Sequence, residues 1–285
     1  MRRIRIEHTT RYEYREPVEF LKHRLLIRPR VGHDIRIESS RLEIQPAYTI
    51  RWYRDVYGNS VATVEFTEQS DKLVITSEVV VQHYEESPTK LVVAEVAEQF
   101  PFHYDPMERV DLTIYLLSAY PRDSAQIGQW LRELWKPGGN IATAELLETI
   151  NQKIVNDIEY EVRESVGVQA PAETLRRKRG SCRDVATLFI EACRFCGVAA
   201  RFVSGYLLSS SAVRDVASTH AWSEVYLPAS GWRGFDSTSG QLAGGEHVAV
   251  AVHRHPEAIS PVSGSYVGPA KPPPVMTVEV RATEL

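Results

Sequence analysis

The stretch Arg179-Gly180-Ser181-Cys182-Arg183-Asp184-Val185-Ala186 decides how the second half of the chain folds. Ser181 and Asp184 have the spacing of a capping box, and the apolar residues that follow have helical periodicity. The pattern therefore predicts a helix that begins at Cys182. There the unpaired backbone N–H groups, the helix dipole and two neighbouring arginines favour a thiolate. A nucleophilic cysteine and a structural helix that happens to begin with cysteine both fit this stretch alone.

A histidine and an aspartate follow in an order suited to nucleophilic catalysis. Residues 218–228 alternate and are rich in aromatic side chains, and 232–236 form a second short strand after the turn at 229–231. A hairpin of these strands can bring His220 and Asp236 together, so that the carboxylate fixes the imidazole tautomer. The other ring nitrogen then faces the thiol of Cys182. We therefore expect these three residues to form a catalytic triad.

Five separated segments resemble the core of the bacterial transglutaminase-like proteins, a branch of the papain-like cysteine hydrolases often described as cysteine proteases. They are Pro171 to Leu175, Gly180 to Asp184, Ala199 to Tyr206, His220 to Tyr226 and Gly231 to Asp236. The resemblance implies that Cys182 is the nucleophile, His220 the general base and acid, and Asp236 the orienting group. The usual Asp-Pro-Thr of the family is Asp-Ser-Thr at 236–238, which keeps the acid.

The fold class that we expect is α+β, with an antiparallel β-sandwich before a papain-like or transglutaminase-like core. In that core the cysteine helix packs on an antiparallel sheet. Residues 1–87 are predicted to be β-rich because alternating segments are bounded by turn residues, and most of them resemble the N-terminal region that accompanies this core in bacterial members. Residues 88–160 are predicted to be a helical and irregular segment. Residues 161–285 are predicted to be the catalytic core with a C-terminal strand, 275–282, which could pair with either domain.

Composition and charge narrow the class of protein. The chain has 285 residues, of which 43% are hydrophobic and 25% charged, and its net charge of −4 argues against a nucleic-acid partner. No apolar run is long enough to span a membrane, and the first residues lack the apolar core of a signal peptide. Three cysteines are too few for a disulfide framework. We therefore expect a cytoplasmic protein without a membrane partner.

Other residues could carry chemistry, and we expect structural roles for them. Cys193 and Cys196 have redox or zinc spacing, yet they follow Cys182 on the same predicted helix without further ligands nearby, so we expect two small core cysteines. His253 and His255 lie near Glu257 without a third ligand pattern, and we expect ordinary surface or loop histidines. The basic run 176–179 is expected to be a solvated face. We accordingly expect neither metal nor cofactor.

The expected chemistry is acyl transfer from an amide of a protein or peptide, through a thioester on Cys182. Water or a primary amine would then attack the thioester, so protease, deamidase and transglutaminase activities all stay open. The oxyanion donors expected are the backbone N–H of Cys182 and, as a second candidate, Tyr160. An amine acetyltransferase is an alternative, although its signature glycines around the nucleophile are not seen. A catalytically weak peptide-binding module on the same core is another. The sequence leaves the oligomeric state open.

Overall fold

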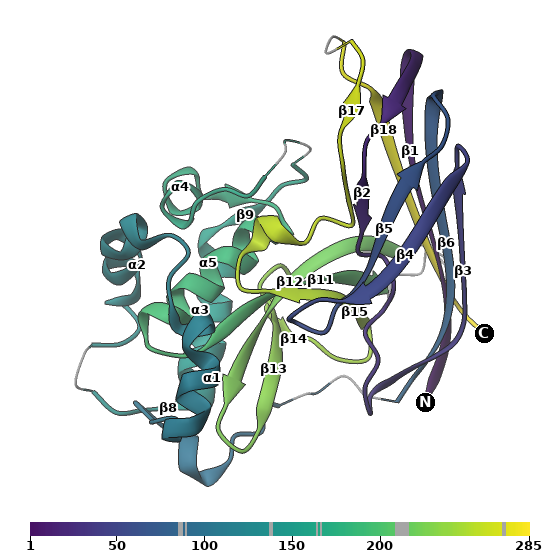
Figure 1. Ribbon diagram of the computed structural model, residues 1–285. Helices are drawn as coiled ribbons and strands as arrows, with labels where there is room; N and C mark the ends of the chain where they lie inside the picture. Colours follow the sequence, from purple (N-terminus) through teal and green to yellow (C-terminus); the bar gives the residue numbers. More distant parts are fainter. Residues whose placement is uncertain are drawn as a thin grey trace.

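The structure, a computed structural model, places a β-sandwich beside a mixed helical and β core (Figure 1). It describes residues 1–84, 88, 90–136, 139–163, 165, 167–208, 217–269 and 272–285, with the backbone alone at 217 and 218. The domain boundary expected at residue 87 falls outside these residues. Both chain ends lie on the sandwich side of the molecule.

Two antiparallel sheets form the sandwich. In the first sheet the strand order is β17-β1-β6-β3, and β18 also pairs with β1. Its strands are β1 (Arg2–Phe20), β3 (Ile35–Gln45), β6 (Ser70–His83), β17 (Tyr266–Val267) and β18 (Val275–Glu284). The second sheet has the order β16-β2-β5-β4, with β16 (Val262–Ser263), β2 (His23–Leu25), β5 (Ser60–Phe66) and β4 (Tyr48–Arg54). Alternating apolar side chains are buried between the sheets, and the predicted antiparallel sandwich is confirmed.

The C-terminal strand returns to the N-terminal sheet. β18 pairs antiparallel with β1 in an unbroken register, from Ile4 opposite Glu284 to Glu13 opposite Val275. Val280 and Ala282 of this strand pack against the main hydrophobic core. The strand that could have joined either half of the protein therefore completes the sandwich.

The helices lie in the middle of the chain. They are α1 (Pro106–Leu116), α2 (Ser124–Leu131), α3 (Thr143–Asp157), α4 (Pro171–Arg177) and α5 (Cys182–Phe195), with short 3-10 turns η1 (Glu95–Ala97), η2 (Pro121–Asp123) and η3 (Pro256–Ala258). This region also contains two short strand pairs. β7 (Gln99–Phe100) pairs with β8 (Ile141–Ala142), and β9 (Glu159–Tyr160) pairs with β10 (Arg179–Gly180). Within the described residues, no helix is long and apolar enough to cross a membrane.

A five-stranded antiparallel sheet supports α5. Its order is β14-β13-β12-β11-β15, with β14 (Gln241–Leu242), β13 (Gly231–Asp236), β12 (Ala217–Leu227), β11 (Ala200–Leu208) and β15 (His247–His253). Phe189 of α5 stacks on Phe235 with ring centroids 5.0 Å apart, and Ser223 Oγ donates to the Ala186 carbonyl at 3.0 Å. The predicted packing of the cysteine helix on an antiparallel sheet is confirmed. One hydrophobic core runs from this helix to Ile4 and Ile6 of the sandwich.

Candidate active site

The cysteine helix begins at Cys182, as its capping box predicts. Ser181 donates to Asp184 Oδ2 twice, from its backbone N–H at 2.9 Å and from its hydroxyl at 2.8 Å. Cys182 is the first residue of α5, so its backbone N–H has no acceptor within the helix. Its side chain is partly exposed. The thiol thus sits at the positive end of the helix dipole, next to a free N–H donor.

Asp184 also fixes the loop that precedes the cysteine. Arg163 donates from Nε and Nη2 to the two carboxylate oxygens, both at 3.0 Å, and the Gln169 backbone N–H donates at 2.7 Å. Burial by itself would raise the pKa of Asp184, but the hydrogen bonds from Arg163, Gln169 and Ser181 lower it below its ordinary value. The sequence analysis did not identify Arg163, because no local pattern links it to a residue 21 positions away.

The structure brings His220 and Asp236 together on neighbouring strands. The register pairs Ser223 with Phe235, whose side chains share one face of the sheet. His220 lies three residues before Ser223 and Asp236 one residue after Phe235, so both side chains point to the opposite face. His220 Nε2 lies 3.0 Å from Asp236 Oδ2, and both side chains are buried. The other ring nitrogen, Nδ1, is left for the thiol.

The environment of His220 favours its protonated form. Burial would lower the pKa of His220, yet hydrogen bonds to Asp236 and to Cys182, together with their charges, raise it to about 10. Burial would raise the pKa of Asp236, but hydrogen bonds from His220, His247 and the Thr238 N–H lower it far below its ordinary value. The pair is therefore imidazolium and carboxylate at neutral pH, and Cys182 lies at the imidazolium.

The turn after Asp236 is held by α3. Ser237 is buried and donates from Oγ to Asn151 Oδ1 at 2.7 Å. Gln152 Nε2 donates to the carbonyl of Gly240 at 2.7 Å, and Gly240 has a φ of +77°, which favours glycine. Serine thus stands where the family resemblance implies a proline, and a buried hydrogen bond fixes the turn.

Tyr160 lies close to the cysteine. In the parallel pair of β9 and β10, Tyr160 is opposite Gly180, two residues before Cys182. Partial burial and the charges of Cys182 and Asp236 raise the pKa of Tyr160. Its side chain is half exposed, and no hydrogen-bond partner for its hydroxyl occurs in the described part of the chain. Tyr160 is thus free to donate a hydrogen bond near the thiol.

Cys193 occupies the core, in keeping with the expectation, whereas Cys196 is partly exposed at the edge of the core. Cys193 is completely buried among apolar residues of α5, and Cys196 packs against the same cluster. Neither forms a disulfide. Burial raises the pKa of Cys193 well above its ordinary value and that of Cys196 to about 12. Both groups therefore stay thiols at neutral pH.

The histidines and arginines that the sequence analysis set aside make local contacts. Nδ1 of His253 accepts the His255 backbone N–H at 2.9 Å, and Nδ1 of His255 accepts the Glu257 N–H at 3.4 Å. In the basic run, Arg176 pairs with Glu173 at 2.7 Å, and Arg179 pairs with Glu159 at 3.2 Å. These arginine side chains are largely exposed, as a solvated face requires.

A second histidine, which the sequence analysis missed, lies at the site. His247 Nε2 is 3.2 Å from the same Asp236 oxygen that bonds His220. The ligand-type atoms of these three residues all lie within 4.8 Å of one another. The two hydrogen bonds to Oδ2 account for this proximity, and we assign no metal ion to the cluster. The sequence offered little to identify His247, because it is one of nine histidines in the chain and no motif surrounds it.

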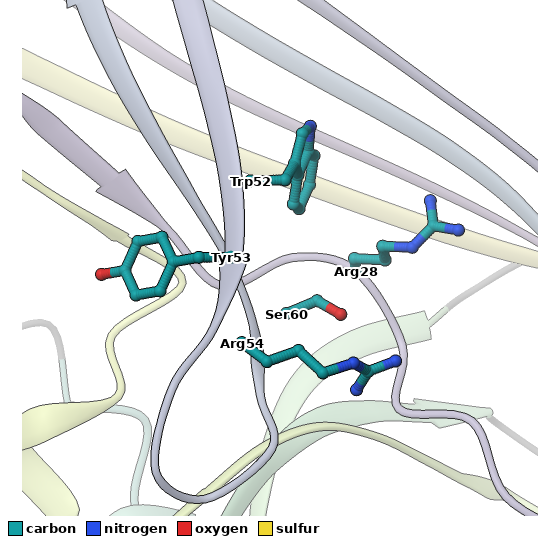
Figure 2. A pocket seen from close by; sticks show the side chains of 5 residues that line it. All are labelled: Arg28, Trp52, Tyr53, Arg54 and Ser60. Carbon is teal, nitrogen blue, oxygen red and sulfur yellow. The ribbon is translucent and has the colours of Figure 1, made fainter.

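A surface pocket of about 380 Å³ lies in the sandwich, and none of the residues discussed above lines it. Its wall consists of Arg28, Trp52, Tyr53, Arg54 and Ser60, from β4, β5 and the segment after β2. Figure 2 shows Trp52, Arg28, Ser60 and Arg54 on one side of the β4 backbone, with Tyr53 pointing to the other side. The pocket is therefore separate from the cysteine, histidine and aspartate.

Two family models match the chain, one in the N-terminal sandwich and one in the core that follows it. The Bacterial transglutaminase-like N-terminal region matches residues 4–82, which form most of the sandwich. The model of the Transglutaminase-like superfamily matches residues 136–237, from before α3 to the residue after Asp236. Residues 136–237 therefore form a transglutaminase-like core. The transglutaminase-like core thus contains Cys182, His220 and Asp236, whereas His247 lies beyond the matched residues.

Relatives and a solved structure extend this likeness over nearly the whole chain. An uncharacterized protein of Mycobacterium tuberculosis is 28% identical over 276 residues, which cover 92% of this chain and 87% of the relative. An uncharacterized protein of Mycobacterium leprae is 24% identical over 280 residues, 94% of each chain. A structure named "Putative Cysteine Protease" from Cytophaga hutchinsonii has a TM-score of 0.76 at 18% identity, covering 100% of this chain and 91% of that one. The transglutaminase-like core and the sandwich therefore share the fold of that structure.

Proposed function

We propose that this protein is a cysteine-dependent hydrolase or acyltransferase that acts on amide or peptide bonds through a thioester on Cys182. The observation that supports it best is the series of contacts from buried Asp236 to His220 and from His220 to Cys182, at the N-terminus of a helix. The name of the Cytophaga hutchinsonii structure, "Putative Cysteine Protease", is consistent with this class. A protein or peptide is the substrate class that we infer.

In the first half of the reaction, the Cys182 sulfur forms a bond to the carbonyl carbon of the amide. Negative charge then develops on the carbonyl oxygen, where the Cys182 backbone N–H and the Tyr160 hydroxyl are the two donors that we propose. The C–N bond breaks, and His220 transfers its proton to the leaving amine nitrogen. Asp236 holds the imidazole in the orientation that this transfer needs. The product of this half-reaction is a thioester and a free amine.

In the second half, a nucleophile attacks the thioester carbon. His220, now neutral, takes a proton from water or from a primary amine as that group attacks. The C–S bond breaks, and the Cys182 thiolate is regenerated next to an imidazolium. Water yields a carboxylic acid, and an amine yields a new amide. Access of the acceptor to Cys182 thus separates hydrolysis from transamidation.

The test is to incubate the protein with a peptide library, with and without an added primary amine, and to identify products by mass. Cleaved, deamidated and amine-linked peptides differ in mass, so the measurement reports substrate and acceptor together. Cys182→Ala should give none of these products. The matched control, Cys193→Ala, removes a buried sulfur from the same helix and should keep the rate within a few-fold.

A peptide-binding module with little or no turnover is the second candidate. The sandwich supports this candidate, because the proposed chemistry at Cys182 does not explain what the sandwich does. Binding of an amide-bearing peptide without any of the three products would favour this module and overturn the enzymatic proposal. Full activity of Cys182→Ala would also overturn the proposal that Cys182 forms the thioester.

A further inference from the structure

One oxygen of Asp236 accepts hydrogen bonds from two imidazole rings. Nε2 of His220 lies 3.0 Å from Oδ2, and Nε2 of His247 lies 3.2 Å from the same atom. The side chains of His220, Asp236 and His247 are 5%, 2% and 9% exposed, so water competes little for these bonds. The two rings therefore share the negative charge of a single carboxylate oxygen.

The second nitrogen of His247 shows where its proton resides. The backbone N–H of Gly244 donates to His247 Nδ1 at 3.3 Å. An Nδ1 that accepts a hydrogen bond carries no proton, and a neutral imidazole then has its proton on Nε2. His247 consequently donates to Asp236 as a neutral N–H group. His220 donates to the same oxygen as a cation.

The ring and backbone of His247 are held from both halves of the protein. The ring packs edge-on against Trp222, with centroids 5.1 Å apart. The Trp222 ring lies over Gly205 of β11, where a Cβ atom would come within 2.6 Å of that ring. His83, at the end of β6 in the sandwich, has its Nε2 3.2 Å from the His247 carbonyl oxygen. His247 thus has little freedom to turn away from Asp236.

We propose that His247 is a positioning residue that fixes the Asp236 carboxylate and withdraws part of its charge, so that His220 can release its proton to the leaving amine. The inference rests on the proposed function for the role of that proton. Among the described residues, two other titratable groups act on the pair: Cys182 from α5 on His220, and Tyr160 from β9 on Asp236. Of the groups around Asp236, His247 forms a direct hydrogen bond to the carboxylate.

The substitution His247→Phe keeps a ring of similar shape and removes the donor. We expect the pKa of His220 to rise by about one unit, because a hydrogen bond to the carboxylate no longer draws charge away from the imidazolium. We expect kcat to fall about tenfold, because a proton that His220 holds more strongly is transferred more slowly to the leaving amine. KM should stay within about twofold of the wild-type value. His247→Gln places an amide N–H near the same position and should restore both values toward those of the wild type.

The measurement is an NMR titration of histidine-labelled protein, which needs no substrate. A rise of the His220 pKa in His247→Phe and its reversal in His247→Gln would support the inference even if the wild type turned over no peptide. An unchanged or lowered pKa in folded His247→Phe, or equal effects of both variants, would overturn it. Turnover by the wild type with an unchanged kcat in His247→Phe would leave the proposed function intact and reject the inference.

A reading on the wild type covers the case in which His247→Phe does not fold. The ring nitrogen shifts of His247 should show a neutral ring that is protonated at Nε2 and unprotonated at Nδ1. Protonation at Nδ1 would contradict the hydrogen bond from Gly244, and the inference would then be wrong.

Discussion

Arg163 and Asp184 form a two-pronged ion pair beside the candidate nucleophile, with Nε and Nη2 each 3.0 Å from a carboxylate oxygen. The Asp184 side chain is fully buried, and that of Arg163 is 14% exposed. Asp184 is the third residue of the helix that begins at Cys182. The pair therefore connects Arg163, in the segment after β9, to the start of the cysteine helix.

Loss of this pair should destabilise the protein strongly. Arg163→Met leaves the Asp184 carboxylate buried without its cation, and we expect the free energy of unfolding to fall by about 3–5 kcal/mol. Denaturant unfolding measures the loss. Arg41→Met is the matched control, because the side chain of Arg41 is 73% exposed and its pairing with Glu43 should contribute less than about 1 kcal/mol. Equal effects of the two substitutions would show that the buried pair has no special role.

Alkylation should distinguish the three cysteines. Burial raises the pKa of Cys193 and of the partly exposed Cys196, whereas Cys182 is partly exposed at a helix N-terminus beside an imidazolium. We expect iodoacetamide near pH 6 to alkylate Cys182 at least about tenfold faster than it alkylates Cys193 or Cys196. Peptide mapping by mass spectrometry measures the order. Similar labelling of all three thiols would argue against an activated Cys182.

Asp236→Asn should reduce turnover strongly in a protein that still folds. An amide cannot anchor the same imidazole tautomer, and loss of the carboxylate removes the charge that stabilises the imidazolium, so we expect kcat to fall by about three to four orders of magnitude. Loss of the ion pair with His220 should also lower the melting temperature, followed by circular dichroism at neutral pH, but the variant should stay folded. Asp111→Asn, at an exposed position of α1, should alter neither value. An unchanged rate in Asp236→Asn would make this aspartate structural.

Stability should decline as the pH rises from neutral into the alkaline range. The pKa of His220 is raised from 6.5 to about 10, so its stabilising contribution is complete below pH 6.5 and is lost as the pH rises through about 10. Denaturant unfolding at pH 6.5, 8 and 10 measures the decline. His220→Gln lacks the titrating ring, and its stability should depend less on pH over this range. Parallel curves for the two proteins would contradict the prediction.

Local sequence patterns identified the elements that carry Cys182, His220 and Asp236. A capping box and apolar periodicity act within a few residues, so the start of α5 could be predicted without the rest of the fold. The hairpin of β12 and β13 is also local, because a three-residue turn sets the register that brings the two strands together. The predicted contact between His220 and Asp236 depends on little else.

The supporting residues depend on contacts between distant parts of the chain. Arg163 lies 21 positions from Asp184, and His247 reaches Asp236 across the turn that follows β13. Neither position has a periodicity or cap that points to its partner, and His253 and His255 looked more suggestive than His247 in the sequence. The pairing of β18 with β1 is likewise decided by packing across the whole chain.

The sequence by itself determined the helix of the candidate nucleophile, the order of the three candidate catalytic residues and the two-part α+β architecture, because capping, alternation and turn chemistry act over short distances. Only the tertiary structure decided that Asp236 has two imidazole donors, that Asp184 is paired with Arg163, and that the last strand returns to the first sheet. These contacts form when burial removes water from polar groups, which must then find partners wherever the fold places them.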